Sequence, residues 1–261
     1  MKTALCLALL CSTAYARSTD ELVAAGTPEQ KAQAVLDEMG HRNAGWRDFT
    51  ADVQMSLQDP SGGNAERSFT VKLLEKGDSG DQSLIVFSSP SDMKGTAVLS
   101  HASASGDDEQ WLYLPSSHRV KRISSGNRNG SFVGSEFSFE DLTSADARKY
   151  RWQYTGQETC GTAKCLVLSA VPKDASSAYS RRVIVVDQEL RVSRVELYDR
   201  KAQLQKTLTY ADWQKVGRYD RARTWTMKNA QSGKATTLHF STMKLDSKYV
   251  AADFGPDKLG N

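Results

Sequence analysis

Apolar and polar residues alternate over residues 48–58, the clearest pattern in this chain. Phe49 and Val53 fall on one side of the alternation, and Asp52 and Gln54 fall on the other. Successive side chains of a β-strand point to opposite faces of its sheet. This period of two therefore predicts a strand with one apolar face and one solvated face.

Similar patterns continue to the C-terminal end of the chain. A turn over 59–64 leads to a return strand over 69–73, and further apolar runs follow, mostly joined by short polar turns. Short connections require antiparallel neighbours, so roughly a dozen runs predict a wide antiparallel sheet in a single domain over 17–261. A twisted sheet of this width curls, and it then closes into a barrel, folds into a sandwich or stays part-open.

Few helices are expected to cover the apolar face of this sheet. Thr27 and Pro28 suit the cap and the first position of a helix. Apolar residues then recur at spacings of three, four and seven, which predicts an amphipathic helix over 28–41. Shorter helical turns are expected near 139–149 and 246–253. If the sheet stays part-open, so little helix leaves an apolar hollow.

The first residues predict export. Lys2 precedes a short apolar run, and residues 14–16 match the small-x-small site of signal peptidase. The run is too short to cross a bilayer as a helix. We therefore expect residues 1–16 to be a cleaved signal peptide, and Arg17 to begin the mature chain. The alternative is an apolar N-terminal helix of the folded domain.

Cysteine usage agrees with an exported protein. Cys6 and Cys11 leave with the predicted signal peptide, so the mature chain keeps Cys160 and Cys165. In an exported chain this pair predicts a disulfide at the turn of a hairpin. A zinc site would need two further ligands nearby, and the whole chain has four histidines at scattered positions.

Charge and motifs exclude several classes of function. Lys and Arg total 34 and Asp and Glu total 31, so a net charge of +3 does not suggest a nucleic-acid partner. The sequence contains no metalloprotease, nucleophile-elbow or phosphate-loop motif. Ser91 and Lys94 fit the Ser-x-x-Lys form of penicillin-binding enzymes, but both partner motifs are absent. We predict no enzyme activity, no cofactor and no metal.

Residues 118–142 contain a long connection that is unusually apolar for a loop. Phe132, Val133, Phe137 and Phe139 are too many apolar side chains for a solvated segment. Long connections of this kind are often functional. One interpretation is ordinary packing over the core, and the other is a movable lid over a ligand hollow.

Arg122 is a candidate tether for this lid. In the preceding strand it shares a face with Val120, and an arginine on an apolar face needs a partner. The candidates are Glu136, Glu140 and Asp141 or backbone carbonyls of the lid. The alternative is that a bulge shifts the register and leaves Arg122 exposed.

Three segments together resemble a known family. They are residues 111–115 (Trp-Leu-Tyr-Leu-Pro), residues 119–123 (Arg-Val-Lys-Arg-Ile) and residues 134–142 (Gly-Ser-Glu-Phe-Ser-Phe-Glu-Asp-Leu). They resemble the signature of LolA-like outer-membrane lipoprotein-sorting proteins, in the larger branch found beside resistance-nodulation-division (RND) type exporters. Glu136 and Phe139 stand where Asp and Tyr are expected, which are mild departures.

The resemblance implies a mainly β fold, a part-open antiparallel β-barrel of about eleven to twelve strands with a few covering helices. It also implies a periplasmic carrier of lipoprotein or lipid acyl chains that moves its cargo towards an outer-membrane acceptor. The alternative is a non-enzymatic adaptor that docks on an RND-type exporter or another envelope complex. We expect the cavity to be lined by Val53, Met55, Phe69, Val71, Leu84 and Val86.

Overall fold

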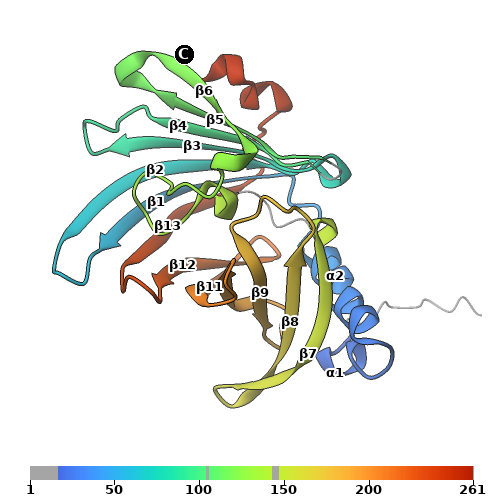
Figure 1. Cartoon of the computed structure of the whole chain (residues 1–261). Coiled ribbons are helices and arrows are strands. Elements are labelled where there is room, and N and C mark those ends of the chain that lie inside the picture. Colours follow the sequence, from blue (N-terminus) through green and yellow to red (C-terminus); the bar gives the residue numbers. More distant parts are fainter. Residues whose placement is uncertain (1–16, 104–105, 143–146, 261) are drawn as a thin grey trace, which may run out of the picture.

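A computed structural model describes residues 17–103, 106–142 and 147–260. The predicted signal peptide, residues 1–16, lies outside the described residues. One antiparallel sheet of thirteen strands dominates the fold (Figure 1). The strands are β1 (Asp48–Gln58), β2 (Asn64–Leu74), β3 (Gln82–Ser89), β4 (Ala97–His101), β5 (Glu109–Leu114), β6 (Arg119–Ile123), β7 (Tyr150–Cys160), β8 (Ala163–Pro172), β9 (Tyr179–Val186), β10 (Val192–Asp199), β11 (Leu204–Val216), β12 (Tyr219–Asn229) and β13 (Ala235–Leu245).

The order of the strands explains how the sheet encloses a space. Strands β1 to β6 run outward to one edge, and β7 to β13 run back from the other edge. The two halves meet where β1 pairs with β13, for example Val53 opposite Phe240. Strands β6 and β7 do not pair, so the curved sheet is unclosed, as the family resemblance implied. The long connection between β6 and β7 therefore passes from one edge of the sheet to the other.

Two helices precede the sheet, α1 (Thr19–Leu22) and α2 (Pro28–Asn43). The helix expected over 28–41 is confirmed and continues for two more residues. Ala32 and Val35 of α2 are fully buried against Leu166 and Leu168 of β8. The helix thus covers the β7–β9 end of the sheet (Figure 1). Among the described residues, neither helix has the length and apolarity needed to cross a bilayer.

The start of α2 gives a prediction about stability. The Thr27 hydroxyl accepts a hydrogen bond from the backbone N–H of Gln30, whose side chain bonds back to the Thr27 backbone N–H. Replacing Thr27 with alanine should lower the free energy of unfolding by about 1 kcal/mol, because the backbone N–H of Gln30 in the first helical turn loses its acceptor. Chemical denaturation measures this loss. Thr27→Ser, which keeps the hydroxyl, should lose much less, and equal losses would contradict the capping role.

The C-terminal segment covers the outer face of the first half of the sheet. After β13 the chain forms two 3₁₀ helices, Ala251–Phe254 and Pro256–Lys258. Phe254 and Leu259 pack against Ala97 and Leu99 on the side of β4 that faces away from the main core. Strand β4 is therefore buried on both faces, and Leu84 and Val86 on the outer face of β3 are half-buried. This explains why residues 84–87 and 97–99 are continuously apolar and do not alternate.

The predicted disulfide is present. Cys160 ends β7 and Cys165 lies near the start of β8, and the bond joins them across the hairpin turn with a Cα–Cα distance of 5.8 Å. The closed loop is short, so the bond restricts the unfolded chain only modestly.

Candidate functional site

The inner side of the curved sheet holds an apolar cavity of about 600 Å³. Helix α2 forms one wall, the β6–β7 connection forms another, and strands from both halves of the sheet form the rest. This volume falls within the range of about 300–1,000 Å³ typical of ligand sites. Representative wall residues are Leu36, Met39, Phe132, Phe137, Leu208 and Met227.

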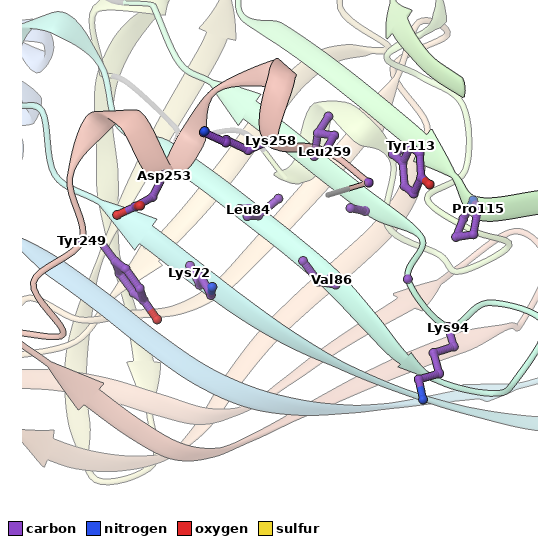
Figure 2. A pocket seen from close by; sticks show the side chains of 13 residues that line it. Lys72, Leu84, Val86, Lys94, Tyr113, Pro115, Tyr249, Asp253, Lys258 and Leu259 are labelled. Carbon is purple, nitrogen blue, oxygen red and sulfur yellow. The ribbon is translucent and has the colours of Figure 1, made fainter. Parts of the chain in front are cut away.

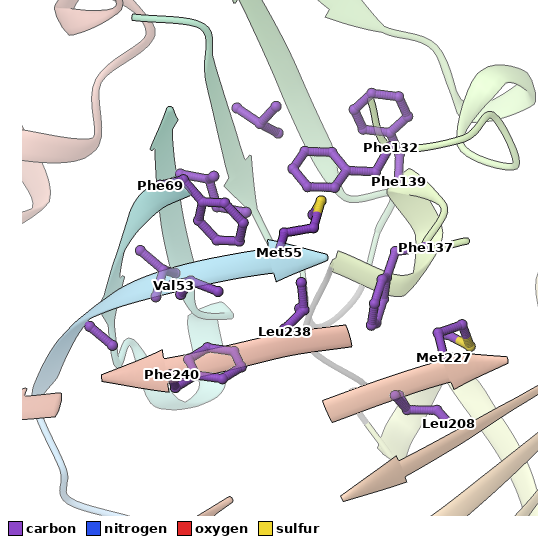
Figure 3. Close-up of a cluster of buried hydrophobic side chains, with 14 of the residues drawn as sticks. Val53, Met55, Phe69, Phe132, Phe137, Phe139, Leu208, Met227, Leu238 and Phe240 are labelled. Atoms are coloured by element: carbon purple, nitrogen blue, oxygen red, sulfur yellow. The ribbon is translucent and has the colours of Figure 1, made fainter. Parts of the chain in front are cut away.

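Four residues expected at the cavity lie on its side of the sheet. Met55, Phe69 and Val71 are in the cavity wall. Val53 is buried in the same apolar cluster, next to the wall (Figure 3). The alternation in β1 and β2 identified this face because the other face of these two strands is polar.

The other two residues expected at the cavity lie elsewhere. Leu84 and Val86 point to the outer face of β3, where they line a separate pocket of about 620 Å³ under the C-terminal segment (Figure 2). Their neighbour Ile85 lines the inner cavity instead. The expectation was wrong by one residue because β3 is apolar on both faces, so its sequence does not identify the inner face.

The apolar part of the β6–β7 connection packs against the inner face of the sheet. Phe132, Phe137 and Phe139 are all buried, and Val133 is half-buried against the same cluster. The ring centroid of Phe132 lies 5.7 Å from that of Phe87 and 5.9 Å from that of Phe139. Figure 3 shows these loop rings within the apolar cluster that also contains Met55, Phe69 and Leu238. The loop thus closes one side of the cavity with its own aromatic residues.

The predicted tether between Arg122 and the lid is wrong. Arg122 donates to Glu109 on the neighbouring strand, and its side chain is 64% exposed. Glu136 accepts a hydrogen bond from the side-chain amide of Asn229. The β5–β6 pairing is regular, so no bulge explains the exposure. Instead β6 is an edge strand beyond the core, where even Val120 is 42% exposed.

This correction gives a second prediction. Arg122→Ala should change the free energy of unfolding by less than about 1 kcal/mol, because exposed ion pairs contribute little. Glu140→Gln, which alters a buried ion pair of the loop, should cost several times more. Thermal or urea denaturation compares the two variants. If Arg122→Ala lost more unfolding free energy than Glu140→Gln, Arg122 would be the residue that tethers the loop.

A buried polar network anchors the loop instead. Glu140 pairs with Arg182 of β9, with Oε1 3.3 Å from the guanidinium, and accepts a hydrogen bond from Ser177. Asp141 accepts from the hydroxyl of Tyr179 at 3.0 Å, and its carboxylate lies 3.6 Å from the Lys206 ammonium. These carboxylates bring loop and sheet together where both are shielded from solvent.

Burial sets the protonation of this network. Burial raises the pKa of the Tyr179 hydroxyl well above its ordinary value, and the charge of Asp141 raises it further. Tyr179 therefore stays neutral and acts as a hydrogen-bond donor. Burial alone would lower the pKa of Arg182, but neighbouring Tyr150, Asp141 and Glu140 outweigh it and raise that pKa. Arg182 therefore stays positively charged.

Comparisons with known proteins fit this architecture. A domain from Vibrio parahaemolyticus described as an outer membrane lipoprotein-sorting protein shares 39% identity, with a TM-score of 0.86, over 88% of this chain and 99% of its own. The chain belongs to the LolA-like family of lipoprotein-sorting proteins. A family model described only as an uncharacterized protein matches residues 79–261. No functionally curated protein matches the sequence.

Two further solved structures share the LolA-like fold. A DUF1329 family protein from Desulfovibrio piger has 27% identity and a TM-score of 0.85, over 90% of this chain and 100% of its own. A LolA superfamily protein from Nitrosomonas europaea has 22% identity and a TM-score of 0.71, with the same coverages, and supports the fold alone.

Sequence reasoning missed the sheet's half of the network in this LolA-like protein. Glu140 and Asp141 were candidate partners, but Arg182, Tyr179 and Lys206 were not singled out. Arg182 shares the inner face of β9 with Ile184, and Lys206 shares that of β11 with Leu208, so a charged residue on an apolar face is the pattern that identifies them.

Proposed function

We propose that this LolA-like protein is a periplasmic carrier that binds the acyl chains of a lipoprotein or lipid and moves them towards the outer membrane. The apolar cavity of about 600 Å³ is the observation that carries the proposal. Family membership supports it. The signal peptide predicted over 1–16 supports a place of action outside the cytoplasm.

The cavity accounts for affinity without specific contacts. Each methylene taken out of water contributes roughly 0.8 kcal/mol. A stretch of about ten methylenes therefore contributes roughly 8 kcal/mol before the cost of ordering the chain. The wall residues Met55, Phe69 and Val71 are apolar and buried, as such a ligand requires.

The connection between β6 and β7 is the part that opens in this proposal. Phe132 and Phe137 line the cavity, so a shift of the loop widens the space through which a chain enters or leaves. The ion pair of Glu140 with Arg182 and the contact of Asp141 with Lys206 hold it closed. Release then follows when an acceptor in the outer membrane favours the open arrangement.

Extraction of the purified full-length chain tests the proposal. Organic solvent should release an amphiphile that mass spectrometry detects, and protein stripped of it should bind added phospholipid. A variant with part of the cavity filled, Val71→Trp, should retain less amphiphile if it folds, which circular dichroism checks. Protein that is empty as purified and also ignores added lipid would overturn the carrier function.

A further inference from the structure

One tyrosine in the cavity wall has an unused hydroxyl. Tyr210 of β11 lines the cavity, and its ring packs edge-on against Trp225 with centroids 5.1 Å apart. Among the described residues, its hydroxyl makes no hydrogen bond. A hydroxyl that faces a cavity without a protein partner is free to form a hydrogen bond with a ligand or water.

Arg182 presents similar unused donors to the same cavity. A guanidinium has five N–H donors. Within the described part of the chain, the Arg182 side chain donates one hydrogen bond, from Nη2 to Glu140 Oε1 at 3.3 Å, which leaves Nη1 available to a ligand, whereas its Nε is fully buried without a partner. Its side chain is 12% exposed and lines the cavity. The guanidinium also stacks on the rings of Tyr150 and Tyr179.

The two groups belong to one region of the cavity. Arg182 lies opposite Leu197 of β10, and Leu197 lies opposite Lys206, four residues before Tyr210 on β11, so both side chains line the cavity from nearby strands. Burial raises the pKa of the Tyr210 hydroxyl. Tyr210 thus remains a neutral donor on the same inner surface as the positively charged Arg182. An apolar hollow with a few convergent donors is typical of a site that orients its ligand.

We propose that Tyr210 and Arg182 together bind the acyl ester carbonyls of the cargo lipid. This inference rests on the proposed carrier function. Glu140 and Asp141 already balance the charges of Arg182 and Lys206, so the site requires a hydrogen-bond acceptor and no additional anion. In a diacyl lipid or a diacylglyceryl-modified protein, ester carbonyls are the acceptors directly attached to the apolar chains. The site therefore selects acyl esters over plain hydrocarbon chains.

Matched ester and ether lipids test this inference. Dioctanoyl phosphatidylglycerol and its dioctyl ether analogue share headgroup and chain length, but the ether lacks both carbonyls. Calorimetric titration of the full-length protein should show about tenfold tighter binding of the ester, as expected for one or two net hydrogen bonds. Tyr210→Phe, which removes only the hydroxyl, should weaken ester binding about three- to tenfold and leave ether binding unchanged.

Two further variants make the result specific. Tyr198→Phe makes the same chemical change at a tyrosine that donates to Glu196 and should not alter the ester preference. Arg182→Lys keeps the charge and should reduce the preference. Equal binding of ester and ether, or equal losses of both in Tyr210→Phe, would overturn this inference and leave the carrier function standing. If neither lipid binds, the carrier function fails as well.

Discussion

Replacing Asp141 with asparagine should lower the free energy of unfolding by about 3–5 kcal/mol, because it breaks a buried charge network. The Asp141 side chain is 5% exposed and accepts hydrogen bonds from Ser138 and Tyr179. Asparagine preserves the shape of the side chain but removes the charge. Lys206, 10% exposed, then lacks its counter-charge. Urea denaturation followed by tryptophan fluorescence measures the loss.

An exposed pair provides the matched control. Asp220 lies 2.7 Å from Lys215, whose side chain is 63% exposed, so Asp220→Asn should cost less than about 1 kcal/mol. Adding Lys206→Met to Asp141→Asn removes the uncompensated cation and should recover part of the stability. If Asp141→Asn were as mild as Asp220→Asn, the network would not be what fixes the loop.

Phe132→Ala should be similarly costly, at about 3–5 kcal/mol, since it empties a fully buried site in the loop. The ring packs between Phe87 and Phe139 and forms part of the cavity wall. The same substitution should also weaken retention of the bound amphiphile, because the loop loses its main apolar contact. Denaturation and mass spectrometry of the extracted lipid measure the two effects.

Phe254 allows the two effects to be separated. It is as buried as Phe132 but lies on the outer face, under the C-terminal segment. Phe254→Ala should therefore destabilise the protein comparably and leave lipid retention unchanged once the protein is folded. Equal loss of lipid in both variants would show that retention follows general stability and not the closing loop.

Strands with one solvated face were predictable from the sequence. The alternation in β1 and the capping residues of α2 identified both elements from a few residues each. The run over 84–87 is apolar on both faces because the C-terminal segment covers the outer face. No local pattern encodes that contact, since it depends on residues more than 150 positions away, such as Phe254 paired through its carbonyl with His101.

The site was predictable in its apolar half only. Four apolar residues in one connection identified the loop, because a solvated segment does not need them. Its anchors depend on which distant strands the loop meets, and Glu140 reaches Arg182 across 42 positions of sequence. The Arg122 hypothesis was wrong because an edge strand and a central strand can have the same local sequence pattern, although different elements pack on their faces.

The pairing of β1 with β13 means that the sheet can form completely only after the last strand has been synthesised. Register places Met55 beside Leu238, so β1 has a neighbour on one side only until the last strand has left the ribosome or the export channel. A chain cut short before Ala235 is not a smaller version of the same protein. It leaves both β1 and β12 with open backbone donors along an apolar sheet, and such chains should aggregate or be degraded.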